Sequence, residues 1–300
     1  MRGMLETAIE AAYAAGKLLR QNFGTPLNVN LATHHDIKLE IDEQAQQTIT
    51  RVILADFPDH AILGEEGVSG RADAAVRWVI DPLDGTVNYF YSIPHYAVSI
   101  AAQVRGEGVA AGTAATSAPG TEQPDRPGQV GAPHVAGDWQ TVAGVVYAPE
   151  VDEMFAVERG RTPTLNGKPI RVSDRVTLAE AIVSIGFFKS EETIRRGLAD
   201  FQHLVGRVRK MRLMGAAALD VVYVASGRYD AYIEYGIKLW DICAGQLILE
   251  QAGGRVALTP TGDPYSYDVR MWNGQVPLDS LTAGIPCSAP VISPDRHPHS

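Results

Sequence analysis

The sequence predicts a mixed fold, α+β in its first half and α/β in its second half. Helical periodicity covers residues 4–23 and resumes from about residue 42. Short strand-like segments separated by Gly, Pro and Asn follow, which favours antiparallel connections. After residue 180, strands alternate with helices, the pattern of an α/β layer. With 300 residues, 45% of them hydrophobic, the chain can bury a substantial core in one large or two smaller domains.

The first half contains two predicted helices and five predicted strands. In residues 4–23, apolar side chains recur at near-helical spacing, and Gly24 with Pro26 marks the end of the helix. The second helix begins at about Asp42 and ends before Pro58. The strands are expected at 61–67, 78–81, 95–104, 141–149 and 153–160.

The second half is expected to alternate strands and helices. We predict strands at 180–188, 229–235 and 255–259, and helices near 190–205, 215–226 and 241–252. Two subdomains follow from this, an N-terminal α+β unit over 1–187 and a C-terminal α/β unit over 188–276, with a partly ordered tail at 277–300. More than half of residues 106–138 are Gly, Ala or Pro, so this segment is expected to be a flexible surface insertion, with a regulatory or binding role as the alternative.

Composition and charge exclude several classes of protein. A net charge of −9 disfavours binding to nucleic-acid phosphates through a basic surface. Glu6 and Glu10 interrupt the apolar run that a signal peptide needs, and no segment approaches a membrane span. Cys243 and Cys287 have no metal-ligand spacing, so neither a disulfide framework nor a zinc site is indicated. We therefore expect a cytoplasmic protein without nucleic-acid or membrane partners.

The stretch "IDPLDGT" combines two carboxylates with turn residues. An apolar run ends at Asp81, and Pro82 with Asp84-Gly85 is turn chemistry. A polar turn after a strand is the ordinary explanation. A turn would also bring both carboxylates to one side, with the Leu83 carbonyl as a further oxygen ligand. Gly85-Thr86 then offers free backbone amides where a helix could begin, which suits a phosphate.

Other carboxylates also follow apolar runs. Glu65 and Glu66 end one such run, and Asp36, Asp42 and Asp241 lie near others. Each has an ordinary role available: Asp241 is expected to be a helix N-cap, Glu66 a solvated turn residue, and Asp36 a turn or capping residue. Several acids beside a core are costly unless a cation lies among them. Without a His or Cys cluster, Mg²⁺ fits better than Zn²⁺.

These motifs resemble the inositol monophosphatase family of magnesium-dependent, lithium-sensitive sugar phosphatases. The first signature is "WVIDPLDGTVNY", the second is "WDICAGQLILEQAGG", and "GEEG" precedes both. The resemblance runs from about residue 5 to 275, with 106–138 as an insertion. It implies a layered α-β-α-β-α sandwich of the sugar phosphatase (fructose-1,6-bisphosphatase-like) type. The family is usually dimeric, so a homodimer is expected.

The resemblance also implies a two-metal site, with a third, weaker ion in the family. The first Mg²⁺ would be bound by Glu65, Asp81 and the Leu83 carbonyl, and the second by Asp81, Asp84 and Asp241. Thr86, oriented by Asp42, would act with Glu65 on a metal-bound water that attacks phosphorus.

The remaining implied contacts are with the substrate. The amides of Gly85 and Thr86 would hold phosphate oxygens, and Glu234 with the backbone of Gly215 to Ala217 would contact polyol hydroxyls. Gly215 as a simple helix start and Glu234 as a solvated strand end are the alternatives.

The sequence departs from the family pattern at four places. Leu31 replaces a usual Lys, and Lys38-Leu39 replaces a usual Val-Thr, which affects the third metal site. His34, His35 or Lys38 would substitute there, although Lys38 as a solvated strand residue is equally open. Lys238 stands where some members carry His, and "ERGRTPTLNG" lacks the usual Gly-x-Gly-Ala-Phe run.

The sequence therefore predicts a Mg²⁺-dependent phosphomonoesterase that hydrolyses a small polyol or sugar phosphate, with inositol monophosphate foremost. The alternatives on the same metal core are fructose-1,6-bisphosphate and histidinol phosphate. A regulatory or binding protein that keeps the fold is the alternative from another class.

Overall fold

The structure of the protein is a computed structural model that describes residues 2–32, 37–71, 73–106, 139–187 and 190–282. Three sequence predictions lie outside these residues. They concern the insertion after Gly106, the roles of His34, His35 and Asp36, and the tail beyond residue 282.

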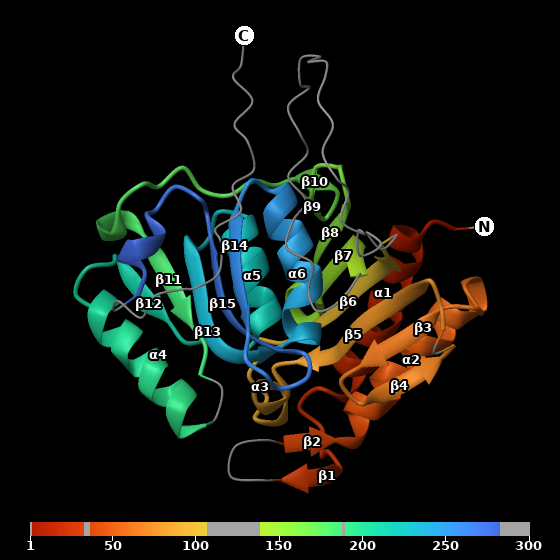
Figure 1. Cartoon of the computed structure of the whole chain (residues 1–300). Coiled ribbons are helices and arrows are strands. Elements are labelled where there is room, and N and C mark those ends of the chain that lie inside the picture. Colours follow the sequence, from red (N-terminus) through yellow and green to blue (C-terminus); the bar gives the residue numbers. More distant parts are fainter. Residues whose placement is uncertain (1, 33–36, 72, 107–138, 188–189, 283–300) are drawn as a thin grey trace, which may run out of the picture.

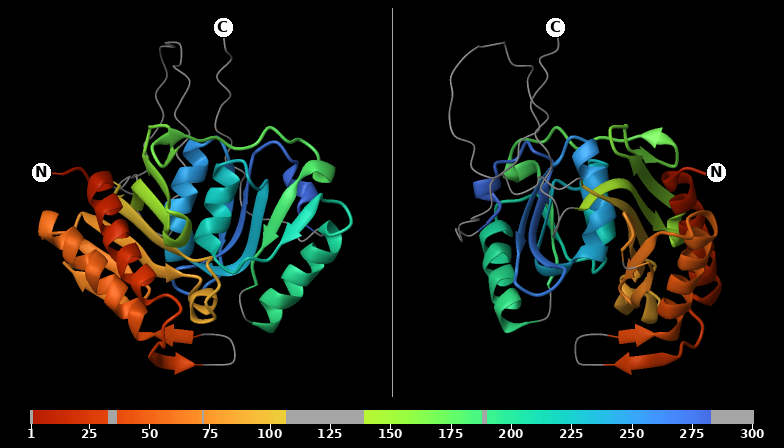
Figure 2. Two further views of the ribbon diagram at one scale, coloured as in Figure 1. Left: turned by 180° about the vertical axis from the view of Figure 1, so that it is seen from behind. Right: turned by 45° about the vertical axis from the view of Figure 1, so that its right-hand side comes forward.

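The described elements stack in five layers, α-β-α-β-α (Figure 1). Helices α1 (Met4–Asn22) and α2 (Glu40–Asp56) cover the outer face of an eight-stranded sheet. Helices α5 (Ala217–Ala225) and α6 (Leu239–Gln251) lie between that sheet and a five-stranded one, and α4 (Glu191–Leu204) covers the far face (Figure 2). The predicted layered sandwich is confirmed.

The eight-stranded sheet is almost wholly antiparallel, as the turn residues predict. Its order is β10-β9-β8-β7-β6-β5-β3-β4, and only the β3–β5 pair is parallel. The strands are β3 (Ala61–Gly64), β4 (Gly67–Gly70), β5 (Val76–Asp84), β6 (Ala97–Arg105), β7 (Trp139–Ala148), β8 (Glu153–Glu158), β9 (Thr164–Leu165) and β10 (Lys168–Pro169). A separate hairpin of β1 (Val29–Ala32) and β2 (Ile37–Leu39) precedes α2.

The five-stranded sheet is mixed and has the order β12-β11-β13-β15-β14. Its strands are β11 (Ile182–Ile185), β12 (Lys210–Arg212), β13 (Ala231–Lys238), β14 (Arg255–Pro260) and β15 (Ser266–Trp272). Strand β15 was not predicted from the sequence, although Tyr267, Val269 and Met271 alternate with Asp268 and Arg270. Since β11 pairs within this sheet, the two sheets divide before residue 182, and a subdomain boundary after residue 187 stays a prediction.

Strand β5 is buried on both faces, and this decides where its functional residues point. Trp78 and Ile80 pack in the core beneath α1 and α2, whereas Val79 packs in the core formed with α5 and α6. Because side chains alternate along a strand, Asp81 follows Val79 onto the face that meets α6. Helix α6 is buried on nearly all sides since it contacts both sheets.

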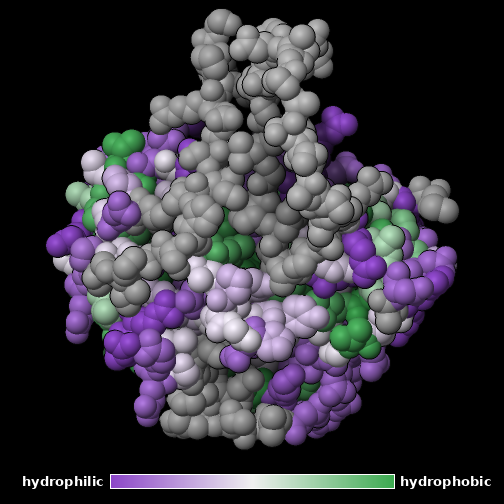
Figure 3. All heavy atoms as spheres, viewed as in Figure 1, coloured by the Kyte–Doolittle hydropathy of each residue, from purple (hydrophilic) through white to green (hydrophobic). Residues whose placement is uncertain are grey.

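The face of the described residues that Figure 3 shows is mainly polar. Figure 3 shows hydrophilic side chains over α4 and over the β3–β4 side, with apolar side chains in small separate groups. Among the described residues, no helix combines the length and the apolar character needed to cross a bilayer. In the predicted tail, Leu281 is fully buried in the core of the second sheet, next to Val276.

Candidate metal centre and active site

Two of the predicted metal ligands come from an irregular stretch of β5. The prediction that the strand ends at Asp81 is wrong: β5 continues to Asp84, with a register shift against β6, where Asp81 pairs with Ser99 and Asp84 with Ala97. Pro82 and Leu83 on β5 thus lie opposite the single residue Val98 on β6, as in a β-bulge. The extra residue lets two carboxylates three positions apart face the same side of the sheet, and Leu83 N–H donates to Asp81 Oδ1 at 2.9 Å.

Asp84 connects the first sheet to the N-terminus of α5. Its carboxylate accepts from the backbone amides of Ala217 (3.1 Å) and Ala218 (2.7 Å). Amides in the first turn of a helix have no partner within the helix, so Asp84 satisfies two of them. The predicted substrate amide of Ala217 is therefore engaged with Asp84.

A short helix begins directly after Asp84, as predicted. Gly85 is the N-cap of α3 (Thr86–Phe90) with φ of +91°, a left-handed conformation that favours glycine. Thr86 Oγ1 donates to the Leu83 carbonyl at 3.0 Å, and Asp42 accepts from Leu39 N–H at 2.8 Å. The contact between Thr86 and Asp42 stays a prediction.

Asp241 lies in the first turn of α6 but not at its N-cap, so that prediction is wrong. Strand β13 runs directly into the helix, Lys238 is the N-cap, and Asp241 is the third residue of the helix. Its Oδ2 accepts from Lys238 N–H at 3.1 Å, the contact of the N3 acid in a capping box. The carboxylate still caps the helix while it faces the residues of β5.

The structure brings these carboxylates together. One oxygen each of Asp81, Asp84 and Asp241 lies within 4.8 Å of the others. Glu65 follows β3, the parallel neighbour of β5, and its amide donates to the Ile80 carbonyl at 3.1 Å. Pairing of β3 with β5 therefore places Glu65 beside Asp81.

Burial raises the pKa of every carboxyl in this group. For Asp81 the neighbouring Glu65 and Asp241 add to the effect, and for Asp84 the main added cause is Asp241. Burial, then Asp241 and Glu66, raise the pKa of Glu65 to about 8. Burial also raises the pKa of Asp241. Such a set holds its negative charge poorly at neutral pH unless a cation compensates it.

The donor set fits Mg²⁺. All the candidate ligand atoms of this cluster are oxygens, with no His or Cys among its residues, and hard oxygen donors suit Mg²⁺ better than softer metals. Burial and the neighbouring negative charges raise the pKa values of these carboxyls, and a bound divalent cation would compensate that negative charge.

The carboxylates line a pocket of about 380 Å³ between the two sheets. Gly215, Ala217 and Glu234 from the predicted substrate side line it as well. Glu234 is 7% exposed and accepts from the Tyr232 hydroxyl, so it is not a solvated strand end. Gly215 has φ of +74° and precedes α5, which begins at Ala217.

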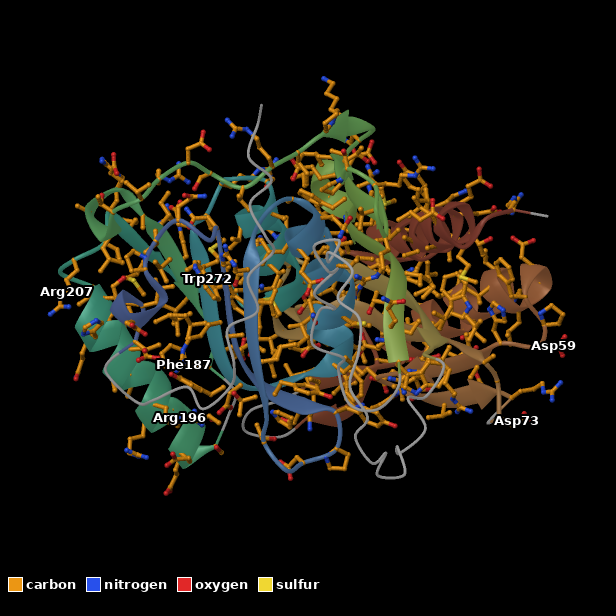
Figure 4. The ribbon with its side chains drawn as sticks, turned by 45° about the horizontal axis from the view of Figure 1, so that its top comes forward. Asp59, Asp73, Phe187, Arg196, Arg207 and Trp272 are labelled. Carbon is orange, nitrogen blue, oxygen red and sulfur yellow. The ribbon has the colours of Figure 1, made fainter. Side chains whose placement is uncertain are left out.

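Three further pocket residues were missed by sequence reasoning. Gly186 leaves room for Glu234, since a Cβ there would lie 1.8 Å from Glu234 Oε2. Phe187 lies on the α4 side of the second sheet (Figure 4) and provides apolar wall. Asp220 on α5 is buried, which raises its pKa to about 7. No sequence motif includes these positions. They reach the pocket because β11 pairs with β13 and α5 packs against that sheet.

The sequence is similar to that of proteins with a known family. A model described as "Inositol monophosphatase family" matches residues 1–119 and 135–289. The chain belongs to the inositol monophosphatase family. It is 37% identical over 265 residues to "Nus factor SuhB" of Pseudomonas aeruginosa, covering 86% of each chain. It is 33% identical over 259 residues to "Inositol-1-monophosphatase" of Rhizobium meliloti, covering 84% of each.

Solved structures show the same fold. An extragenic suppressor protein suhB from Bartonella henselae matches with a TM-score of 0.72 and 29% identity, over 90% of this chain and 93% of that one. An inositol monophosphatase from Anabaena matches with a TM-score of 0.69 and 33% identity, over 90% of each chain. The family and the fold expected from the motifs are thus confirmed.

Two of the departures from the family pattern can be placed in the structure. Lys38 Nζ donates to both carboxylate oxygens of Glu66 at 3.0 Å, so neither residue is simply solvated. Lys238 lines the pocket next to Asp241.

Proposed function

We propose that this protein is a Mg²⁺-dependent phosphomonoesterase acting on a small polyol phosphate, with inositol monophosphate as the foremost substrate. The observation that carries the proposal is the convergence of Asp81, Asp84 and Asp241 on one pocket wall, with Glu65 beside them. A phosphate ester in the pocket would meet this wall at one end and Glu234 at the other.

Each group of residues has a role in this reaction. Bound Mg²⁺ would supply positive charge for the phosphate and for the leaving oxygen, and would acidify water. Asp81, Asp84, Asp241, Glu65 and the Leu83 carbonyl would hold it. Gly85 and Thr86 line the pocket, and their amides would orient the phosphate. Glu65, whose pKa burial raises to about 8, would accept a proton from the attacking water together with Thr86.

The opposite end of the pocket favours a hydroxylated alcohol. Glu234 accepts a hydrogen bond from the Tyr232 hydroxyl. Its carboxylate lies in space that a side chain at residue 186 would fill, and Gly186 has none. A buried carboxylate at this position offers hydrogen-bond acceptors to hydroxyl groups, which a polyol supplies in number. Lys238 also lines the pocket and would attract a second anionic group, so sugar bisphosphates belong to the test.

A panel of phosphate esters at one Mg²⁺ concentration tests the proposal. We expect the highest kcat/KM for inositol monophosphate and lower values for histidinol phosphate, fructose 1,6-bisphosphate and p-nitrophenyl phosphate. Preference for either of the first two alternatives would reassign the substrate on the same metal core. Absence of Mg²⁺-dependent turnover on every ester would reject the enzyme.

A second candidate role comes from the relatives named Nus factor SuhB. By that likeness the protein would act through a partner, as a regulatory protein that keeps the fold, and the expected absence of nucleic-acid partners stays a prediction. A variant without turnover, Asp84→Asn, that fully supports the cellular role of the gene would favour this candidate. Loss of the cellular role together with turnover would favour the enzyme.

A further inference from the structure

Strand β13 has a bulge where it passes the pocket. Its register against β15 shifts between Glu234 and Ile237. Two residues of β13, Tyr235 and Gly236, thus lie opposite the single residue Asp268 of β15. Gly236 has φ of +81°, a left-handed conformation that favours glycine.

The bulge decides where the pocket residues of β13 point. Side chains alternate along a regular strand, so residues three positions apart point to opposite faces. Tyr235 packs in the core that α4 covers. Because of the extra residue, Glu234 and Ile237 both line the pocket although they are three positions apart. The bulge therefore sets the spacing between Glu234 and the first turn of α6, which carries Asp241.

Two side chains of β15 complete the backbone hydrogen bonds of Gly236. Asp268 Oδ1 accepts from Gly236 N–H at 3.1 Å, and Ser266 Oγ donates to the Gly236 carbonyl at 2.9 Å. A bulge leaves backbone groups without strand partners, and such groups are costly where they are buried. Gly236 is buried, so the two bonds stabilise this shape of the strand.

Arg196 of α4 orients the Asp268 carboxylate. Its Nη2 donates to Asp268 Oδ2 at 2.6 Å, which leaves Oδ1 for the bulge, and the two side chains are only 20% and 18% exposed. The guanidinium carbon lies 3.9 Å from the centroid of the Tyr235 ring, and the Tyr235 hydroxyl donates to buried Asp200 of α4. Helix α4, on which Figure 4 labels Arg196, thus holds both sides of the bulge.

We propose that Asp268, oriented by Arg196, is a positioning residue for recognition of the alcohol: it holds the bulge of β13 and so places Glu234 at the substrate end of the pocket. The inference rests on the proposed function, in which Glu234 accepts hydrogen bonds from hydroxyls of the alcohol. Asp268 is not among the residues that line the pocket, so it acts through the strand and not by contact with the substrate.

The metal side of the bulge has its own attachment. Ser99 Oγ donates to the Trp240 carbonyl at 3.1 Å, which fixes the first turn of α6 to the first sheet. Loss of the Asp268 contact is therefore expected to displace Glu234 and to leave Asp241 in place. Recognition of the alcohol should weaken while the metal centre stays intact.

Steady-state kinetics on two esters measure this effect. For Asp268→Ala we expect KM for inositol monophosphate to rise about fivefold, with kcat within about twofold of the wild type. KM for p-nitrophenyl phosphate, which has no alcohol hydroxyls, should not change. Asp268→Asn keeps one acceptor oxygen and should raise KM for inositol monophosphate by no more than about twofold. Arg196→Met, which removes the orienting contact, should raise it about threefold.

Arg195→Met is a matched control on the same helix. Arg195 pairs with Glu192, and their side chains are 71% and 60% exposed, so its loss should leave both KM values unchanged. Hydrogen exchange of the amides of residues 234–238 in the metal-free protein gives a readout that is independent of turnover. Exchange should be faster in Asp268→Ala than in Asp268→Asn, and Arg195→Met should match the wild type.

The outcomes separate this inference from the proposed function. A merely structural role would speed exchange but keep the ratio of the two KM values as in the wild type, and that result overturns the positioning role alone. If the wild type hydrolyses neither ester, the proposed function fails and the inference falls with it. Should Asp268→Ala not fold, Ser266→Ala removes the other side-chain bond to Gly236, and an unchanged KM ratio in that variant would contradict the role.

Discussion

The Asp84 carboxylate accepts a hydrogen bond from the backbone amide of Ala218 at 2.7 Å, across 134 residues of sequence. This bond ties the bulged end of β5 in the first sheet to the helix layer between the sheets. The same carboxylate lies within 4.8 Å of Asp81 and Asp241. One side chain therefore anchors the fold and forms the candidate metal centre.

Asp84→Asn should separate these two roles. We expect turnover to fall at least about a hundredfold, because the metal centre loses a charged ligand. The melting temperature in EDTA should change little, since the loss of one amide hydrogen bond is offset by the removal of a buried negative charge. Mg²⁺-dependent turnover close to that of the wild type would refute the ligand assignment.

The metal-free protein should lose stability as pH rises from about 5 to 8. Burial raises the pKa of Glu65 from 4.5 to about 8, so the folded state binds more protons than the unfolded chain in this range. Stability then falls by on the order of 1 kcal/mol per pH unit. Urea unfolding in EDTA at several pH values measures the slope.

Saturating Mg²⁺ should reverse this trend. Metal binding requires deprotonated carboxylates, so stabilisation by Mg²⁺ should be larger at pH 8 than at pH 6. Thermal melts with and without MgCl₂ at the two pH values provide the comparison. Equal stabilisation at both would contradict the assignment of Glu65 and its neighbours as ligands.

Close packing of α6 on the first sheet depends on Gly144. A Cβ at Gly144 of β7 would lie 2.8 Å from the Ala244 carbonyl of α6. We expect Gly144→Ala to destabilise the protein by about 1–3 kcal/mol, measured by urea unfolding. Gly206→Ala is the control, because nothing lies within 4 Å of the added atom; equal effects of the two changes would argue against the close contact.

Motifs carried most of the site prediction. The sequence motifs single out Asp81, Asp84 and Asp241, which the structure brings together, while their role as metal ligands, with Glu65, stays a prediction. The strand layers could be predicted from alternation and turn residues. Both the motifs and the alternation are local signals, because each depends only on residues that are neighbours in the sequence.

Features that depend on contacts between distant segments could not be predicted. The bulge at Asp81 requires the register of β5 against β6, and the N3 position of Asp241 depends on β13 entering α6 without a loop. Gly186 carries no local mark, because its role is to leave room for Glu234 from a neighbouring strand.

Gly186→Ala should therefore test the substrate end of the pocket. The added Cβ would lie 1.8 Å from Glu234 Oε2 and 2.3 Å from its Cδ, so the carboxylate must move. We expect KM for inositol monophosphate to rise about tenfold, as for the loss of a hydrogen bond to a charged group. The metal ligands are untouched, so kcat should stay within about threefold.

The matched substrate is p-nitrophenyl phosphate, which has no alcohol hydroxyls for Glu234 to bind. Its KM should be the same for Gly186→Ala and the wild type, and Glu234→Gln should reproduce the split between the two substrates. An equal rise in KM for both esters would place the effect at the phosphate or the metal centre. Glu234 would then have no part in recognising the alcohol, and the preference for a polyol would need another origin in the pocket.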